Sequence, residues 1–241
     1  MEMFSVVARL AVPAGHDLNE CNNFKEIIER MKHLKIVETD DYVEFELLFL
    51  SDKKVDAVGV AYCHWKTLKI FETCFDDWIN VEDGGSDARN CERFTMIATH
   101  VEFSDFRDTG ESVTTTAEHS AARIDGTHRT VKHSFDLSFS AARRRSSKFR
   151  FPVDAQSMVD YGKKHLSKPL KKDSKVKWRY FECIDNETAD FLRTDKTFTY
   201  YKCNQVVDKM VGINDQHRFR FAENTIRAFK TFTMHDKPST Y

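Results

Sequence analysis

Residues 42–50, with the sequence YVEFELLFL, predict a β-strand because apolar and aromatic side chains fill this short segment. One face of the strand carries four alternating apolar residues, Val43, Phe45, Leu47 and Phe49. Leu48 and Leu50 add apolar positions to the other face, so we expect the sheet to be partly covered on both sides.

Helical and extended patterns continue on both sides of this segment. The apolar residues from Phe24 to Leu34 recur at helical spacing, which predicts a helix there. Asn22 or Asn23 can cap its start. Further helices are expected at residues 99–106, 154–166 and 223–233. Further strands are expected at residues 3–12, 35–38, 55–75, 93–97, 112–124, 127–139, 148–151, 176–184, 197–203 and 217–221. Asp125-Gly126 would form the hairpin turn between the two long strands on either side of it.

The order strand, helix, several strands and short helix occurs twice, which predicts an α+β protein with two structurally related domains. Residues 140–147 are small or basic and interrupt the pattern. We therefore expect an N-terminal domain at residues 1–139, a connector at 140–148 and a C-terminal domain at 149–241.

The formal charge of −1 conceals a strong asymmetry along the chain. Residues 143–179 contain 13 Lys or Arg and three Asp, a formal charge of +10, so the remainder carries −11. A concentrated basic zone indicates a polyanionic partner such as nucleic acid. The alternative is a solvated loop at residues 168–177 and a flexible linker at 143–145. The three arginines also precede Ser146 and Ser147 in the pattern of basophilic kinase sites, which makes both serines candidates for phosphorylation.

Dedicated enzyme machinery is not visible in the sequence. It contains no G-x-x-x-x-G-K-[ST], G-x-G-x-x-G, H-E-x-x-H or G-x-S-x-G motif, and its six cysteines include no C-x-x-C pair. We therefore expect no catalytic residue, cofactor or metal. An enzyme with a dispersed site stays an alternative, and its candidate residues are Cys91, His100 and Asp105.

Targeting and membrane signals are also missing. No stretch approaches the ~20 uncharged apolar residues of a membrane helix, and the N-terminus lacks the basic and small-residue pattern of a secretory signal. These features favour a soluble protein of the cytosol or nucleus, with free thiols.

Five strings of the sequence carry a resemblance to a known family. Residues 23–34 match the family's first helix, and residues 56–62 match a strand that leads into the aromatic-rich segment at 71–78. In residues 126–139 a glycine and basic residues lead into the strand-like string HSFDLSF. Residues 219–232, with the sequence FRFAENTIRAFKTF, match a strand that runs into a helix. Together these strings resemble the sliding-clamp superfamily, and specifically the Rad-nine type of subunit in the 9-1-1 checkpoint clamp.

This resemblance implies two clamp-like domains of antiparallel sheets with helices on the inner face, the second truncated at Tyr241. It implies a nuclear, non-enzymatic subunit of a heterotrimeric ring that encircles double-stranded DNA without sequence specificity and scaffolds DNA-damage checkpoint and repair factors. The partners would be clamp subunits of the Rad-one and Hus-one types and a clamp loader. By position on the matching helices, the DNA-facing candidates are Lys25, Arg30, Lys32, Lys163, Lys164, Lys168, Arg227 and Lys230. The rival class is an α+β scaffold without nucleic acid, whose basic residues at 163–177 meet an acidic protein.

Overall fold

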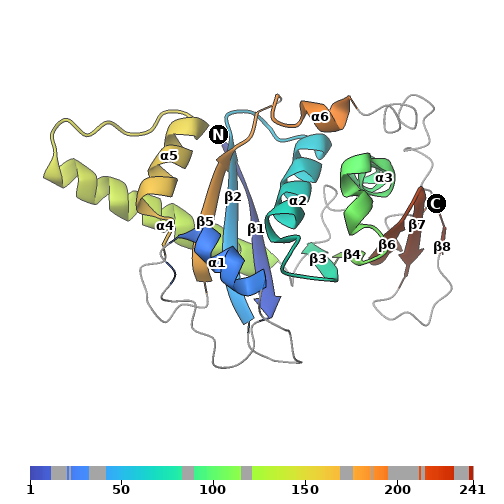
Figure 1. Ribbon diagram of the computed structural model, residues 1–241. Helices are drawn as coiled ribbons and strands as arrows, with labels where there is room; N and C mark the ends of the chain where they lie inside the picture. Colours follow the sequence, from blue (N-terminus) through green and yellow to red (C-terminus); the bar gives the residue numbers. More distant parts are fainter. Residues whose placement is uncertain are drawn as a thin grey trace. The chain divides into compact units, whose positions relative to one another are not determined.

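The structure is a computed structural model that describes residues 1–11, 21, 23–32, 42–82, 90–114, 121–168, 176–185, 187–194, 212, 215–230 and 239–240 (Figure 1). It is an α+β protein with a three-stranded and a five-stranded sheet, as the sequence predicts at this coarse level. The chain divides into two compact units. Unit 1 comprises Met1–Lys54, Lys69–Phe75 and Ile124–Ile184, and unit 2 comprises Val55–Leu68, Asp76–Arg123 and Asp185–Tyr241.

Unit 1 is built on a three-stranded sheet with β2 (Tyr42–Ser51) between β1 (Glu2–Ala11) and β5 (Val176–Cys183). β2 pairs antiparallel with β1 and parallel with β5. Every residue of β2 after Tyr42 is buried. The strand predicted at residues 42–50 and its cover on both faces are therefore confirmed.

Helix α1 (Phe24–Lys32) covers one face of this sheet, and helices α4 (Ala121–Arg145) and α5 (Ala155–His165) cover the other (Figure 1). On the α1 face, the rings of Phe24 and Phe45 lie 5.8 Å apart. On the opposite face, one core cluster joins the sheet to both helices through Leu48, Leu50, Val131, Phe135, Val159 and Phe181. Alternate residues of β2 thus feed two separate cores.

Unit 2 is built on a five-stranded sheet in the order β3-β4-β6-β7-β8, with β3 and β4 parallel and the other pairs antiparallel. The strands are β3 (Trp78–Glu82), β4 (Gly110–Thr114), β6 (Arg218–Ala222), β7 (Thr225–Phe229) and β8 (Ser239–Thr240). Its helices are α3 (Cys91–Thr99), the 3-10 helix η1 (Val101–Phe106), α6 (Asp190–Arg193) and the part of α2 (Ala57–Phe71) up to Leu68. Phe94 of α3 packs on the sheet, with its ring 4.5 Å from that of Phe219.

The hairpin predicted at residues 112–139 is wrong, because residues after 120 form the long helix α4. Val131, Phe135 and Phe139 recur every fourth residue and pack into the core, whereas Leu137 is 52% exposed. When apolar residues occupy every second position, half of them also recur every fourth residue and so lie on one face of a helix. In α4 this face packs against the sheet. The connector predicted at 140–148 is likewise helical as far as Arg145, where α4 ends.

Two other predicted strands are helices. Residues 57–71 form α2, whose first turn is closed by the side chain of Asp56 accepting a hydrogen bond from the Gly59 amide at 2.9 Å. Residues 91–99 form α3, which is capped by the Asn90 side chain and buried continuously from Arg93 to Ala98. A short run of buried apolar residues has no periodicity that separates helix from strand. The capping residues before it predict the helix better than the apolar pattern does.

The helix predicted at residues 223–233 is also wrong over its described part. Asn224 adopts the left-handed conformation with φ 52° and forms a tight turn between β6 and β7. In β7, buried Ile226 and Ala228 flank exposed Arg227, which is the period of a strand. Residues 148–151 contain no strand, although the strands predicted near 3–12, 176–184 and 217–221 and the helices near 22–34 and 154–166 are confirmed.

The sheets are mixed rather than antiparallel, because each contains one parallel pair that a hairpin cannot connect. Their strand orders differ, so the described residues do not repeat one sheet twice. Both compact units also draw residues from either side of the predicted connector. The strands predicted at 35–38 and 197–203 lie outside the described residues.

Candidate nucleic-acid interface

Helix α4 ends in three consecutive cations. Its last three residues, Arg143, Arg144 and Arg145, are all exposed. The chain then turns: the Ser146 amide donates to the Ala142 carbonyl at 3.0 Å, and the Ser146 hydroxyl accepts from the Lys148 amide at 3.2 Å. Cations at a helix C-terminus are favourable for the helix dipole, by about 0.3–1 kcal/mol each at low ionic strength. The dipole therefore accounts for some of this charge, but not for the cations beyond the helix.

Helix α5 is fixed firmly in unit 1. Asp154 and Ser157 form a capping box at its start, where the Ala155 amide also donates to the Asp52 carboxylate at 2.9 Å. Gly162 lies so close to β5 that a Cβ there would be 2.6 Å from the Phe181 ring. This close approach places the exposed Lys163 and Lys164 at a rigid position beside the core.

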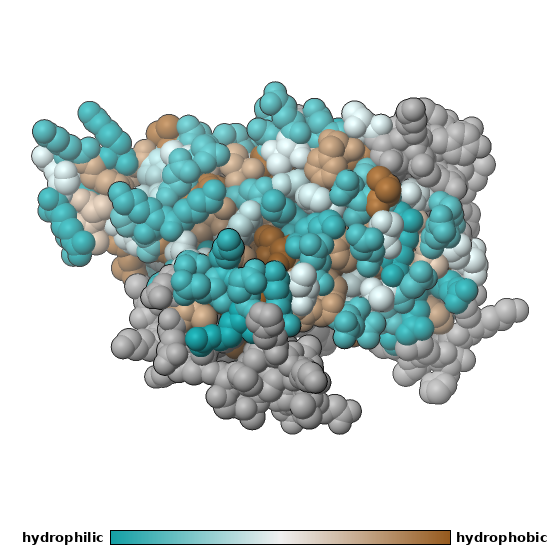
Figure 2. All heavy atoms as spheres, viewed as in Figure 1, coloured by the Kyte–Doolittle hydropathy of each residue, from teal (hydrophilic) through white to brown (hydrophobic). Residues whose placement is uncertain are grey.

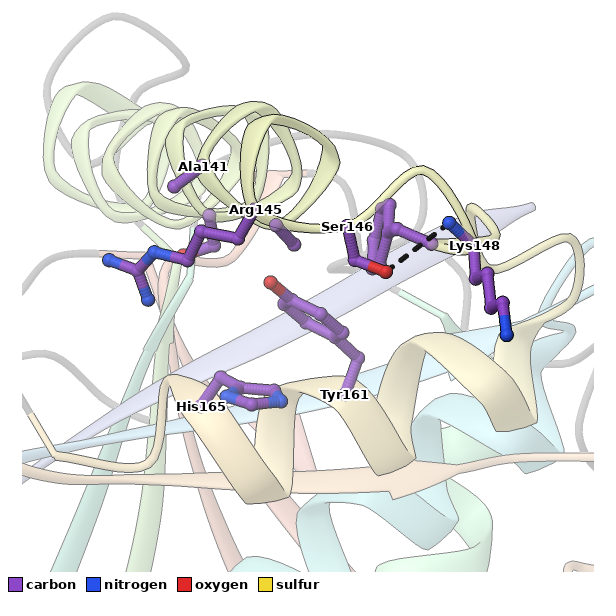
Figure 3. A pocket seen from close by; sticks show the side chains of 9 residues that line it. Ala141, Arg145, Ser146, Lys148, Tyr161 and His165 are labelled. Atoms are coloured by element: carbon purple, nitrogen blue, oxygen red, sulfur yellow. Dashed lines mark hydrogen bonds between the residues drawn. The ribbon is translucent and has the colours of Figure 1, made fainter.

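A pocket of about 510 Å³ opens between the C-terminal ends of α4 and α5 (Figure 3). Tyr161 rises from α5 toward α4, with Arg145 and His165 on one side of it and Lys148 on the other (Figure 3). The lining residues are Ser138, Ala141, Ala142, Arg145, Ser146, Lys148, Phe149, Tyr161 and His165. None of these nine residues is acidic, so the pocket favours an anionic ligand.

Aromatic rings form one side of this region. The Tyr161 ring lies 4.7 Å from that of Phe139 and 4.5 Å from that of His165. Phe149 and Phe151 continue the cluster with their rings 5.4 Å apart, and Phe151 is 49% exposed. The rings hold the 149–151 segment against the two helices and leave aromatic surface accessible to a partner.

Cations gather at the C-terminal ends of α4 and α5 and in the segment between the two helices. We call these seven residues the α4–α5 surface: Arg143, Arg144, Arg145, Lys148, Arg150, Lys163 and Lys164. None of the seven is in an ion pair with a described acidic residue, whereas Arg179 binds Glu46 and Arg193 binds Asp56. Hydrophilic side chains project around this end of α4 in Figure 2. This charge is available to a partner because no carboxylate in the described residues neutralises it.

The predicted DNA-facing residues do not share one surface. Lys25, Arg30 and Lys32 lie on α1, on the opposite face of the sheet from α5, and Lys32 is paired with Glu29 at 2.8 Å. Lys168 lies over the Trp178 ring, which packs near Phe24 of α1. Lys163 and Lys164 alone of the predicted set belong to the α4–α5 surface.

Arg227 and Lys230 belong to unit 2, where Arg227 is exposed on strand β7 and Lys230 follows it. The predicted helix that would carry them is absent there. Ser146 and Ser147 are exposed, and Ser146 lines the pocket; their phosphorylation stays a prediction.

Sequence reasoning missed Tyr161, His165 and Phe149 as parts of the site. Tyr161 and His165 are four residues apart on α5, a spacing that places them on one helix face, but nothing in the sequence shows that α4 ends opposite that face. Both helices pack on the same sheet, whose strands come from distant segments of the chain.

Two of the candidate residues for an enzyme site, Cys91 and His100, lie at opposite ends of one helix. Cys91 begins α3 and His100 follows its end, so the two lie roughly 13 Å apart along the helix axis. Among the described residues, no group of three His, Cys, Asp or Glu is placed to hold a metal ion. The described helices also include none that is long and apolar enough to cross a membrane.

Comparisons with known proteins identify no relative: no protein-family model, curated protein or solved structure matches the chain. The resemblance to the checkpoint clamp therefore stays a prediction, and the function must be argued from the site itself.

Proposed function

We propose that unit 1 binds a nucleic-acid duplex through the α4–α5 surface without reading its base sequence. The observation that carries the proposal is the set of seven exposed cations that have no ion pair with the described residues. Residues 143–164, which contain these seven cations, carry only two Asp, a formal charge of +5.

Phosphate groups are the partner that suits this charge. Lys and Arg that neutralise phosphates release counterions, which gives affinity for any sequence and a steep dependence on salt. Phe151 is 49% exposed and offers a ring on which the terminal base pair of a duplex can stack, a contact that an acidic protein does not make.

The narrower form of the proposal makes this chain a nuclear subunit of a DNA-damage checkpoint clamp, with two clamp partners and a loader. The exposed Lys163 and Lys164 of α5 support it, whereas the lysines of α1 lie on the opposite face of the sheet. A clamp subunit requires one type of domain repeated twice, with basic residues on a common concave wall. The different strand orders of the two sheets weigh against the repeated domain. DNA binding by unit 1 does not depend on this narrower form.

The test is the salt dependence of binding to a blunt DNA duplex, measured by fluorescence anisotropy with the full chain. Reversing Lys163→Glu and Lys164→Glu together removes two phosphate contacts and should lower the slope of log K against log salt by about 2. The matched control reverses Lys53 and Lys54, an exposed pair in unit 1 beside Asp52, which binds the opposite end of α5.

Three outcomes separate the alternatives. Loss of affinity in the Lys163/Lys164 variant but not in the Lys53/Lys54 variant supports the proposal. Equal losses in both variants indicate a general charge effect and contradict it. Absence of duplex binding by the wild-type chain at low salt excludes the proposal and favours the protein scaffold.

A further inference from the structure

We infer that the pocket between α4 and α5 receives one unpaired nucleotide of the bound nucleic acid, with its base on the Tyr161 ring and its phosphate on the side of Arg145 and His165. The inference rests on the proposed function, because the cations outside the pocket would hold the adjoining backbone. It adds a preference for strand ends, gaps or bulges over continuous duplex.

The chemistry of the lining residues identifies a ligand that is both aromatic and anionic. Tyr161 and Phe149 supply rings, Arg145, Lys148 and His165 supply nitrogen donors, and Ser138 and Ser146 supply hydroxyls. An aromatic base attached to a phosphate matches this combination, whereas inorganic phosphate would leave the rings unused and an apolar ligand would leave the cations unused.

The shape of the pocket is consistent with one such group. Its volume of about 510 Å³ falls within the range of roughly 300–1,000 Å³ that small-molecule sites occupy. Ala141 and Ala142 form part of the α4 side, and their small side chains leave room opposite Tyr161. A paired base presents only its edges, so the base must be unpaired to lay its face on the ring.

The supporting residues hold Tyr161 in place before any ligand binds. Its ring contacts those of Phe139 and His165, and α5 itself is fixed by the capping box at Asp154 and by the close approach of Gly162 to Phe181. A rigid aromatic platform loses little conformational freedom when a base stacks on it.

The experiment compares the full chain on a blunt DNA duplex, the same duplex with one unpaired 2-aminopurine nucleotide at its end, and free AMP as a competitor. Stacking on Tyr161 should quench the 2-aminopurine fluorescence. Tyr161→Leu should weaken binding of the tailed duplex about tenfold and leave binding of the blunt duplex unchanged. Tyr161→Phe keeps the ring and should preserve the quenching.

Ala142→Trp provides a second variant, which keeps Tyr161 and fills the pocket from the α4 side. It should abolish the quenching while leaving binding of the blunt duplex intact. Far-UV circular dichroism of each variant checks that the fold is kept. If Tyr161→Leu loses the fold, Ala142→Trp decides the question alone.

The outcomes separate the inference from the proposed function. Equal affinities for tailed and blunt duplex with no quenching overturn the inference and leave duplex binding standing. Competition by AMP as strong as that of the tailed duplex shows a mononucleotide site and overturns the assignment to a strand. Failure to bind any duplex overturns the proposed function itself.

Discussion

The two units treat polar side chains in opposite ways. Unit 1 pairs its buried charges, as in Arg179 with Glu46, and leaves the cations of the α4–α5 surface exposed without ion pairs among the described residues. Unit 2 pairs cations of its sheet, such as Arg218 with Glu111, but buries polar atoms such as His64 Nδ1 and Ser112 Oγ, which have no hydrogen-bond partner in the described residues. Unit 1 thus has exposed cations that a partner can bind, whereas unit 2 buries polar atoms without hydrogen bonds, which lowers its own stability.

The largest expected effect comes from breaking the buried ion pair of unit 1. Arg179 and Glu46 have side chains only 7% and 5% exposed, with Nε and Oε2 2.5 Å apart. Arg179→Met would leave the Glu46 carboxylate buried without its cation and should lower the free energy of unfolding by about 3–5 kcal/mol. Urea denaturation measures the loss.

The matched variant in unit 2 is Arg193→Met. Arg193 binds Asp56 in two hydrogen bonds, but the Asp56 side chain is 53% exposed, so water replaces the lost partner. The expected loss is about 0–1 kcal/mol. Losses of equal size in the two variants would contradict the view that burial, rather than pairing, sets the cost.

The second effect is a pH dependence that originates in unit 2. Burial, with a contribution from the charge of Arg93, lowers the pKa of His64 from 6.5 to about 3. Between pH 6.5 and 3 the unfolded chain binds a proton that folded His64 does not bind. Stability therefore falls as the pH decreases through this window, by at most about 1.4 kcal/mol per pH unit.

His64→Phe should flatten this dependence, because phenylalanine cannot take up the proton in the unfolded chain. The replacement keeps an aromatic ring next to Trp78, whose ring lies 4.8 Å from that of His64. Urea denaturation of both proteins at several pH values between 4 and 7 provides the comparison. The same slope in variant and wild type would show that other groups cause the acid sensitivity.

Sequence alone predicts some elements of the fold better than others, for a physical reason. Strand β2 is apolar on both faces and α1 has a single apolar stripe with a capping Asn23, so each pattern permits one structure. In α3 the buried residues follow one another without a period, and in α4 the apolar residues fit two periods. Only packing against the sheet, which depends on distant segments, decides between helix and strand there.

The site shows the same limit. The concentration of charge after residue 143 is visible in the sequence, and Lys163 and Lys164 could be chosen from it. Which cations share a face could not be predicted, since α1 and α5 cover opposite faces of a sheet whose parallel pair joins β2 to a strand more than 120 residues later. The pocket residues all fall between Ser138 and His165, but the two helices that carry most of them both pack on this sheet.

The smallest effect contrasts two helix glycines, one in each unit. A Cβ at Gly162 in α5 would lie 2.6 Å from the ring of Phe181, which is 1% exposed and cannot move freely. Overpacking of this kind costs about 1–3 kcal/mol, and the gain in helix propensity returns about 1 kcal/mol. Gly162→Ala should therefore lower the free energy of unfolding by up to about 2 kcal/mol.

Gly59→Ala in α2 gains the same propensity with less strain. Its Cβ would lie 2.7 Å from Cγ1 of Val55, a half-buried side chain that can rotate away, so we expect stability within about 1 kcal/mol of the wild type. Thermal and urea denaturation of both variants would give the difference. If Gly162→Ala proved as stable as Gly59→Ala, α5 would not be held rigidly against β5, and the fixed position of Tyr161 in the pocket would lose its structural basis.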